Sequence, residues 1–251
     1  MPATQRTATG DREAPPELEV APGVWASAGL CAWLKRERTI VAADAHLGFE
    51  AVAAGDGACF PRRQKAIILA RLKSILDRYR PELFVVAGDF KHNFSRNLRQ
   101  EMDEVGDVLG FLDSRADVAF VRGNHDNYLQ ALLPEGAALP ETLEVGEILI
   151  AHGHKETELV RRWRGPVISA HEHPSLKLRD GVGARVFAPA FVHDAESGTL
   201  VLPAISPLAF GSDILRGRFL SPVLRRFDRE RLRVIAVAGS GLLDFGLAGR
   251  I

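Results

Sequence analysis

The feature that most constrains this chain is a series of five short apolar runs, each followed within three residues by Asp, Asn or His. The runs occupy residues 39–43, 83–87, 118–121, 148–151 and 167–170. Each run is short, continuous and mostly aliphatic, which is typical of a strand buried on both faces. In open α/β sheets, ligand sites form at the carboxyl ends of the strands. We therefore expect side chains from five strand ends to meet in one cleft.

Amphipathic helices are expected between the first three runs. Apolar residues at 68, 69, 72, 75, 76 and 79 recur at three- and four-residue steps, so the segment 62–79 is predicted to be helical. Pro61, directly before it, suits the first position of that helix. A second helix is predicted over about 97–113. Three later runs, at 184–188, 199–203 and 232–237, are expected to form a second sheet. The pattern predicts a layered α/β fold.

The composition favours one ordinary globular domain. A chain of 251 residues with 46% hydrophobic and 25% charged residues can bury a large core without disulfides. Residues 1–17 are polar, contain three prolines and show no periodicity, so we expect a disordered or loosely attached arm before a single domain over 18–251. Two cysteines, Cys31 and Cys59, make no disulfide framework and are expected to be reduced thiols.

Neither a signal peptide nor a membrane span is expected. The first 19 residues lack an apolar core segment, and no run of about 18 apolar residues occurs. We therefore expect a cytoplasmic protein with no membrane partner. The oligomeric state is left open.

Charge is balanced overall but unevenly placed. Lys and Arg number 32, as do Asp and Glu, which argues against a strongly basic nucleic-acid coat. From Arg161 onward the excess is basic, which fits either a rim for an anionic substrate or a solvated surface. The run Arg161-Arg162-Trp163-Arg164 could grip a phosphate backbone or form a helix face that packs its tryptophan. The glycine-containing segment 48–60 could be a lid or a connecting loop.

Histidine dominates the chemistry of the strand ends. Seven of the eight histidines follow a predicted strand, and only His193 lies elsewhere. One such histidine is usually a hydrogen-bonded core residue, but five motifs in chain order favour a metal site. Imidazoles, carboxylates and an amide suit borderline divalent ions such as Mn²⁺, Fe²⁺ or Zn²⁺. The motifs are Asp44-Ala45-His46, Gly88-Asp89-Phe90-Lys91-His92, Gly123-Asn124-His125-Asp126, His152-Gly153-His154 and His171-Glu172-His173.

These motifs resemble those of the calcineurin-like metallophosphoesterase superfamily, whose series is Asp-x-His, Gly-Asp, Gly-Asn-His-Asp/Glu, His and Gly-His-x-His. The segment 202–208, Leu-Pro-Ala-Ile-Ser-Pro-Leu, followed by Gly211-Ser212-Asp213 resembles the SbcD-related phosphoesterases of archaea and bacteria. The chain lacks the capping and coiled-coil attachments of full SbcD nucleases, and Ala170 stands where the family usually has Gly. The resemblance implies a four-layer α/β/β/α sandwich with a dinuclear metal site.

The resemblance also implies a role for each motif residue. His125 would not be a ligand; it would stabilise or protonate the phosphoryl group. His92 stands where many phosphatase relatives have Asp or Asn and SbcD-type nucleases have His, which favours a diester. His154 would support a ligand, and Glu172 would lie at the surface or behind a ligand. The implied ligands are Asp44, His46 and His173 for the first ion, Asp89 as the bridge, and Asn124, His152 and His171 for the second ion.

The function expected from these residues is hydrolysis of a phosphodiester, in nucleic acid or a nucleotide, by a hydroxide that bridges two divalent ions, with Mn²⁺ favoured and Fe²⁺ or Zn²⁺ as alternatives. One rival is a phosphomonoesterase with the same site. Another is a non-catalytic scaffold, like the retromer subunit that carries this fold. His125 argues against the scaffold, because a structural role needs no uncoordinated histidine. No P-loop and no complete dinucleotide fingerprint occurs.

Overall fold

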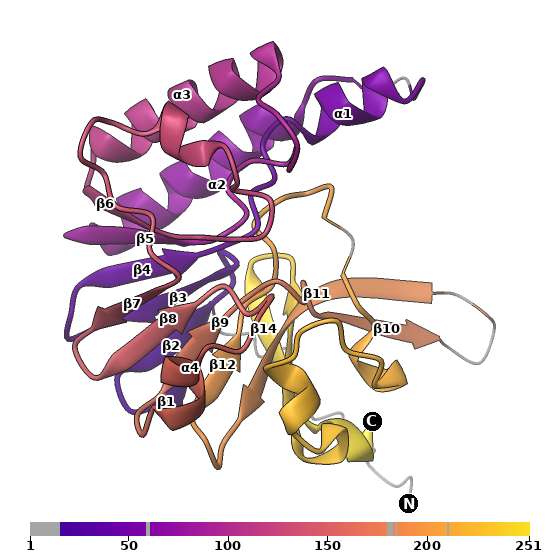
Figure 1. The fold of residues 1–251 in the computed structure, drawn as a ribbon. Helices are drawn as coiled ribbons and strands as arrows, with labels where there is room; N and C mark the ends of the chain where they lie inside the picture. The colour runs from indigo at the N-terminus through magenta and orange to yellow at the C-terminus, as the bar shows by residue number, and fades with distance from the viewer. Residues whose placement is uncertain (1–15, 59–60, 180–182, 184, 210) are drawn as a thin grey trace, which may run out of the picture.

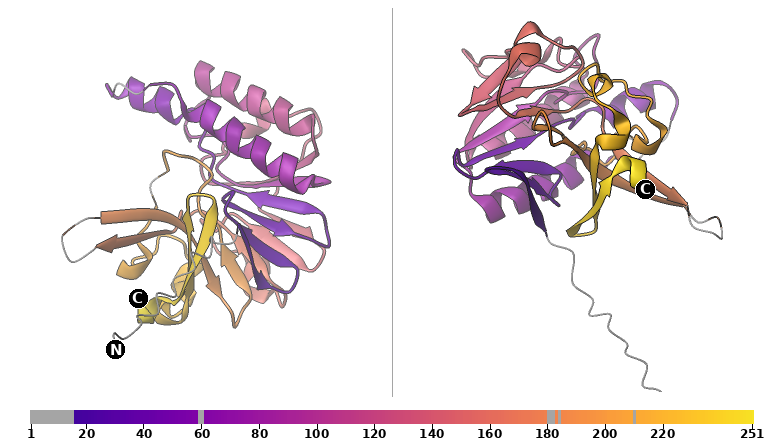
Figure 2. Two further views of the ribbon diagram at one scale, coloured as in Figure 1. Left: turned by 180° about the vertical axis from the view of Figure 1, so that it is seen from behind. Right: turned by 90° about the horizontal axis from the view of Figure 1, so that it is seen from below.

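Two stacked sheets with helical layers outside them make up the fold (Figures 1 and 2). The structure is a computed structural model that describes residues 16–58, 61–179, 183, 185–209 and 211–251. The expected four-layer α/β/β/α arrangement is confirmed. None of the helices described is both long and apolar enough to cross a bilayer.

The first sheet has six strands in chain order. The first four strands run antiparallel as a meander, and the last three run parallel. The strands are β1 (Glu17–Ala21), β2 (Val24–Ser27), β3 (Cys31–Leu34), β4 (Thr39–Ala42), β5 (Leu83–Ala87) and β6 (Asp117–Val121). The helices that follow β4 and β5 are α1 (Phe49–Gly55), α2 (Gln64–Tyr79) and α3 (Arg99–Asp113). Both predicted helices are therefore confirmed, but Pro61 is not the first residue of α2, which begins at Gln64 after the N-cap residue Arg63.

The second sheet has eight strands in the order β14-β13-β11-β12-β9-β8-β7, with β10 paired to β11. Its strands are β7 (Thr142–Val145), β8 (Ile148–Ala151), β9 (Val167–Ser169), β10 (Ser175–Arg179), β11 (Arg185–Asp194), β12 (Thr199–Val201), β13 (Arg233–Ala238) and β14 (Gly241–Leu247). The five predicted strands divide between the sheets, since β8 and β9 belong here. The cleft therefore lies between two sheets rather than at the edge of one.

Alternating side chains give the first sheet two buried faces. Val41 and Val85 point between the sheets, where they meet Ile150 of β8 and Ile168 of β9. Their strand neighbours, which include Ile40 and Phe84, pack beneath the helices. The apolar stripe of α2, predicted from its periodicity, supplies Ile68, Leu72 and Ile75 to that layer.

The outer layer of the second sheet is made of short helical turns. It consists of α4 (Glu158–Arg162) and the 3-10 turns η2 (Ile214–Arg216), η3 (Leu224–Arg226), η4 (Arg229–Arg231) and η5 (Ala248–Arg250); a further turn, η1 (Leu129–Leu132), packs beneath α3. Arg161 and Arg162 form ion pairs with Glu156 and Glu158, while Trp163 packs against the core. The basic run thus forms a solvated helix face with a packed tryptophan.

The N-terminal arm reaches the first sheet at its last residues. Residues 1–15 lie outside the described part of the chain, as does Cys59. The carbonyl of Pro16 accepts a hydrogen bond from the Ala28 N–H at 2.9 Å, and β1 begins at Glu17. Cys31 is a free, buried thiol whose pKa burial raises to about 12, so it is inert.

A buried ion pair ties α3 to the loop after β5. Lys91 Nζ lies 3.4 Å from Glu101 Oε2, and neither side chain is exposed. The same carboxylate accepts hydrogen bonds from the backbone N–H groups of His92 at 2.9 Å and Asn93 at 2.7 Å. The ion pair thus holds in place the loop that follows the Gly-Asp motif.

Replacing Glu101 with alanine should leave the Lys91 ammonium buried without its carboxylate. We expect the free energy of unfolding to fall by about 3–5 kcal/mol, measured by urea denaturation. Asp107→Ala is the matched control, because Asp107 lies on the same helix in an exposed pair with Lys65; it should cost less than about 1 kcal/mol. Equal losses in the two variants would show that the buried pair does not hold the loop.

Candidate active site

The candidate site is a pocket of about 360 Å³ at the carboxyl ends of strands from both sheets. Motif residues follow β4, β5 and β6 of the first sheet and β8 and β9 of the second. Six of the nine predicted site residues line this pocket, and the other three, Asp44, His92 and His152, lie within 3.3 Å of lining residues. Its lining residues are His46, Asp89, Asn124, His125, His171, Glu172, His173, Gly211, Ser212 and Leu220.

Five of the predicted ligands have a left-handed backbone conformation. Their φ angles are 58° for Asp44, 46° for His46, 49° for Asp89, 69° for His171 and 47° for His173. Residues other than glycine seldom adopt this region, and such strain gathers at functional sites. The chain therefore turns sharply at each of these positions, immediately after its strand.

Asp44, His46, Asp89 and His173 form one group of potential ligands. Their donor atoms all lie within 4.8 Å of one another. His173 Nε2 lies 3.2 Å from Asp44 Oδ1 and 3.3 Å from His46 Nε2. His46 Nε2 is 3.8 Å from Asp89 Oδ2.

Asp89 also belongs to a second group, with His152 and His171. Asp89 Oδ2 lies 3.3 Å from His152 Nε2, which is 3.2 Å from Asn124 Oδ1. The other ring nitrogen of His152 lies 3.0 Å from the Ala87 carbonyl oxygen, so the ring is held from behind. Asp89 is the residue common to both groups, as expected for a carboxylate between two ions.

Burial and charge set the protonation of the cluster. Burial lowers the pKa of His46 to about 3, against the charges of Asp89 and Asp44, and lowers the pKa of His171 to about 4. For His152, burial is outweighed by Asp89, which raises the pKa to about 9. Asp44 likewise raises the pKa of His173 against burial. The two buried carboxylates thus favour the protonated forms of His152 and His173.

The donor set fits divalent metal ions. Asp44 Oδ1 is buried, and although His173 Nε2 lies 3.2 Å away, this oxygen accepts no well-aligned hydrogen bond from the described residues. The surrounding imidazole nitrogens and the Asn124 amide oxygen are donors that suit borderline divalent ions. An ion between these atoms would satisfy the orphaned carboxylate oxygen and balance the buried negative charge.

His125 and His92 lie on one side of the cluster. The backbone N–H of His125 donates to Asp89 Oδ1 at 2.8 Å, and its Nδ1 contacts the carbonyl oxygen of His92. The two rings stack at 5.2 Å with an interplanar angle of 12°. His92 Nδ1 is 3.2 Å from His46 Nδ1.

Asp126 organises the two loops behind the cluster. Its buried carboxylate accepts hydrogen bonds from the backbone N–H groups of Asp89 at 2.8 Å, Phe90 at 3.0 Å and Gly123 at 2.8 Å. Burial and the charge of Asp89 raise its pKa to about 6. This role of Asp126 was not predicted from the sequence, although its place in Gly-Asn-His-Asp was the available signal.

Other supporting contacts carried weaker sequence signals. Gln64 Nε2 donates to the His46 carbonyl at 2.9 Å and to Ser206 Oγ at 3.0 Å, which joins α2 to the segment 202–208. Nothing marked Gln64 except its place at a helix start. Glu172 is buried and accepts the Ser221 N–H at 2.7 Å, so it lies behind the ligands rather than at the surface. The His154 ring is 5.3 Å from that of His152.

Two stacked sheets with an Asp, Asn and His cluster at their facing strand ends define a metallophosphoesterase. The family model for calcineurin-like phosphoesterases matches residues 37–216, and the chain belongs to this family. The family uses divalent metals to hydrolyse phosphate esters. The closer relationship to SbcD stays a prediction.

A solved structure shares this fold. The chain is similar to the nuclease MPE of Pseudomonas putida, with 20% identity and a TM-score of 0.64 over 91% of this chain and 98% of that one. It also matches Yfce, a phosphoesterase from E. coli, with 15% identity and a TM-score of 0.41 over 83% of this chain and 98% of that one. No curated protein sequence matches significantly.

The shared position of Asp89 predicts how metal content depends on it. Asp89→Asn removes a charge from both donor groups, so we expect loss of most bound Mn²⁺ in elemental analysis. His125→Ala should keep about two ions per chain, while kcat falls by about 10²–10⁴, the usual range for general acid–base help. Loss of the ions from His125→Ala would make that histidine a ligand.

Proposed function

We propose that this chain hydrolyses phosphodiesters with two divalent ions, with Mn²⁺ as the favoured metal. The observation that carries the proposal is the shared position of Asp89 between two donor groups in an open pocket. Asp44, His46 and His173 would hold one ion, and Asn124, His152 and His171 the other, with Asp89 between them. When bound, such ions activate water and neutralise charge on phosphoryl oxygens.

His125 would supply the proton that the leaving oxygen needs. Its backbone N–H is anchored on Asp89, and its Nδ1 meets the carbonyl oxygen of His92. A carbonyl oxygen only accepts, so Nδ1 carries a proton there, which leaves Nε2 as the atom for proton transfer. Protonated at Nε2, the ring can donate to the departing oxygen as a general acid.

His92 supports a diester rather than a monoester. Burial and the nearby His125 lower its pKa to about 4, so its imidazole is neutral at pH 7. A neutral ring offers no positive charge to stabilise the second negative charge of a monoester dianion. It would contact the additional ester arm of a diester, because it stacks on His125, which lines the pocket.

The rim of the pocket supports an organic group on the phosphate. Phe94 is 62% exposed, and its ring lies 6.1 Å from that of His125. Leu220, which lines the pocket, is 63% exposed. Exposed large apolar side chains beside a polar site favour a substrate that brings its own apolar surface, such as the flat face of a nucleobase.

A bis-aryl phosphate should be cleaved faster than a mono-aryl phosphate in Mn²⁺. His92→Ala should lower kcat/KM for the diester about tenfold more than for the monoester, because only the diester has a second arm for that ring to meet. His193→Ala is the control, since His193 is a buried histidine on β11 outside the pocket. Both activities should change equally in that variant.

The rival functions predict other outcomes of the same assay. A monoester preference in the unmodified protein would establish the phosphomonoesterase. Equal losses on both substrates in His92→Ala would remove the argument for the diester. Absence of both activities in a chain that retains its metals would favour the scaffold.

A further inference from the structure

Lys91 stands one residue before His92 in the chain, and its side chain is completely buried. Lysine is seldom fully buried, because an ammonium ion loses its hydration in the protein interior. Hydrolysis by two metal ions and His125 requires nothing of this ammonium group. Its burial so close to the active site therefore calls for a separate physical reason.

The ammonium group of Lys91 meets an oxygen acceptor for each of its N–H donors. Its Nζ lies 3.4 Å from Glu101 Oε2 and 3.4 Å from the carbonyl oxygen of His125. It also donates to the carbonyl oxygen of Asn93. Among the described residues, no other donor reaches the His125 carbonyl. The ammonium thus joins α3, the loop after β5 and the loop after β6 at one point.

The Glu101 carboxylate completes this arrangement from α3. Its Oε1 accepts the backbone N–H groups of His92 and Asn93, while its Oε2 faces Lys91. Both charged groups therefore hold the loop that carries His92, the ammonium through a carbonyl oxygen and the carboxylate through N–H groups. Because the two charges cancel, the pair can stay buried behind the active site.

His125 is held at its backbone N–H, its carbonyl oxygen and its ring. The N–H donates to Asp89 Oδ1 at 2.8 Å, the carbonyl accepts from Lys91, and Nδ1 contacts the His92 carbonyl oxygen. The contact with Asp89 fixes only one end of the residue, which leaves the ring free to swing about that point. Lys91 fixes the other end directly, and with Glu101 it also fixes the loop that presents the His92 carbonyl.

We propose that Lys91 is a positioning residue for His125. Its buried ammonium, neutralised by Glu101, holds the His125 backbone and the His92 loop so that the Nε2 atom of His125 stays directed toward the leaving oxygen. Lys91 acts through His125 and does not touch substrate, because no part of its side chain is exposed. The proposal rests on the proposed function, in which His125 gives a proton to the leaving oxygen, and adds a further residue to it.

A small displacement of His125 would be costly. Proton transfer needs the donor within hydrogen-bond reach of the leaving oxygen. A misplacement of about 1 Å can cost about 10²-fold in rate. Among the described residues, the partners of Nζ are Glu101, Asn93 and His125, none of which is a proposed metal ligand. Loss of the ammonium should therefore impair proton transfer without releasing the ions.

The test removes both charges of the pair together. Lys91→Met alone would leave the Glu101 carboxylate buried and unpaired, which destabilises the fold. The double variant Lys91→Met, Glu101→Gln leaves no buried charge, and the amide of Glu101→Gln keeps an oxygen for the N–H groups of His92 and Asn93. Hydrolysis is measured in Mn²⁺ on bis(4-nitrophenyl) phosphate and on diphenyl phosphate. 4-Nitrophenolate leaves readily without a proton, whereas phenolate needs one.

The two leaving groups separate positioning from a general loss of structure. The double variant should lose about 10²-fold in kcat on diphenyl phosphate but less than about threefold on bis(4-nitrophenyl) phosphate. KM should change by less than about twofold, and elemental analysis should still find about two Mn²⁺ ions per chain. Partial unfolding would instead lower both rates by the same factor, because the remaining folded fraction cleaves both substrates.

A variant without His125 shows whether Lys91 acts through it. In the His125→Ala background, the double variant should lose less than about twofold further on diphenyl phosphate, because no imidazole is left to position. A second loss of about 10²-fold in that background would overturn the proposal. So would loss of the Mn²⁺ ions from the double variant with His125 intact, since the pair would then act on the ligands.

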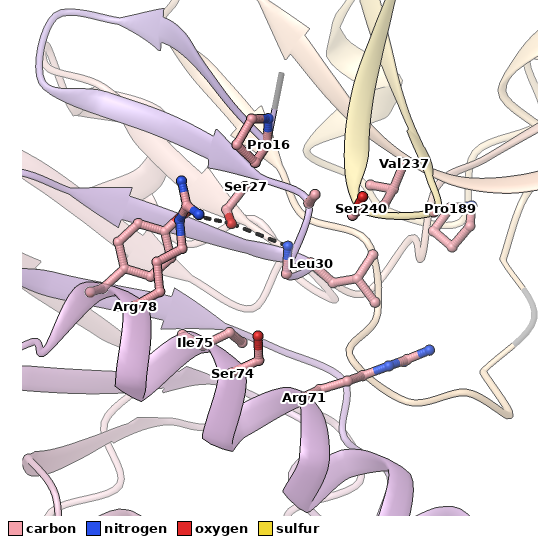
Figure 3. A pocket seen from close by; sticks show the side chains of 14 residues that line it. Pro16, Ser27, Leu30, Arg71, Ser74, Ile75, Arg78, Pro189, Val237 and Ser240 are labelled. Atoms are coloured by element: carbon pink, nitrogen blue, oxygen red, sulfur yellow. Dashed lines mark hydrogen bonds between the residues drawn. The ribbon is translucent and has the colours of Figure 1, made fainter. Parts of the chain in front are cut away.

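Arg71 supplies the matched control. It is a partly buried cation on α2 that also donates to a backbone carbonyl, that of Ile205. Figure 3 shows Arg71 extending from α2 into a groove of about 720 Å³, and none of the described residues that line this groove is a proposed site residue. Arg71→Met should therefore change both rates by equal factors. A selective loss on diphenyl phosphate in this control would overturn the proposal.

The outcomes distinguish this proposal from the proposed function. If the unmodified chain cleaves both diesters and the double variant loses both activities equally, the role of Lys91 alone is defeated. A chain that cleaves only monoesters defeats the proposed diester hydrolysis, and the same comparison on phenyl phosphate and 4-nitrophenyl phosphate then decides the role of Lys91. A chain that retains its ions and cleaves neither class defeats both proposals.

Discussion

Two carboxylates, Asp44 and Asp89, are buried where the ends of the two sheets meet, and the surrounding structure is arranged to hold them. The Asp89 backbone is bound by Asp126, and one carboxylate oxygen accepts the N–H of His125. Across the interface, the His171 N–H donates to Asp44 Oδ2 at 3.2 Å. Buried charges need partners, so the turns that follow the central strands are shaped by this requirement.

The central strands and the ligand motifs were predictable because each gives a local signal. Runs such as Ile148–Ala151 are buried on both faces, and apolar continuity reports that directly. The meander β1–β3 and the half-buried strand β10 lack such runs and were therefore not predicted. Helix α1 was also missed, because its seven residues are too few for a periodic pattern. The role of Gln64 depends on Ser206, distant in the chain, which no local pattern reveals.

The left-handed ligands show how the surrounding network supports the site. A non-glycine residue in that conformation costs about 1–3 kcal/mol, and five ligands share it. The hydrogen bonds of Asp126, Glu101 and Gln64 to nearby backbone groups offset that cost. At Gly88 and Gly123 a side chain would collide with His152 and Asp89, respectively, so these glycines let the loops approach.

The order of the ligands along the chain has a consequence for protein synthesis. Asp44 and His46 are made early, but their partner His173 lies 127 residues after His46. A ribosome that has completed the first sheet, which ends at Val121, has therefore produced Asp44, His46 and Asp89, and Asn124 follows three residues later, but none of the histidines that follow β8 and β9 has been made. A nascent or prematurely terminated chain of that length lacks His173 from the first donor group and both His152 and His171 from the second. The growing polypeptide thus carries an incomplete metal site until the second sheet has emerged and packed against the first.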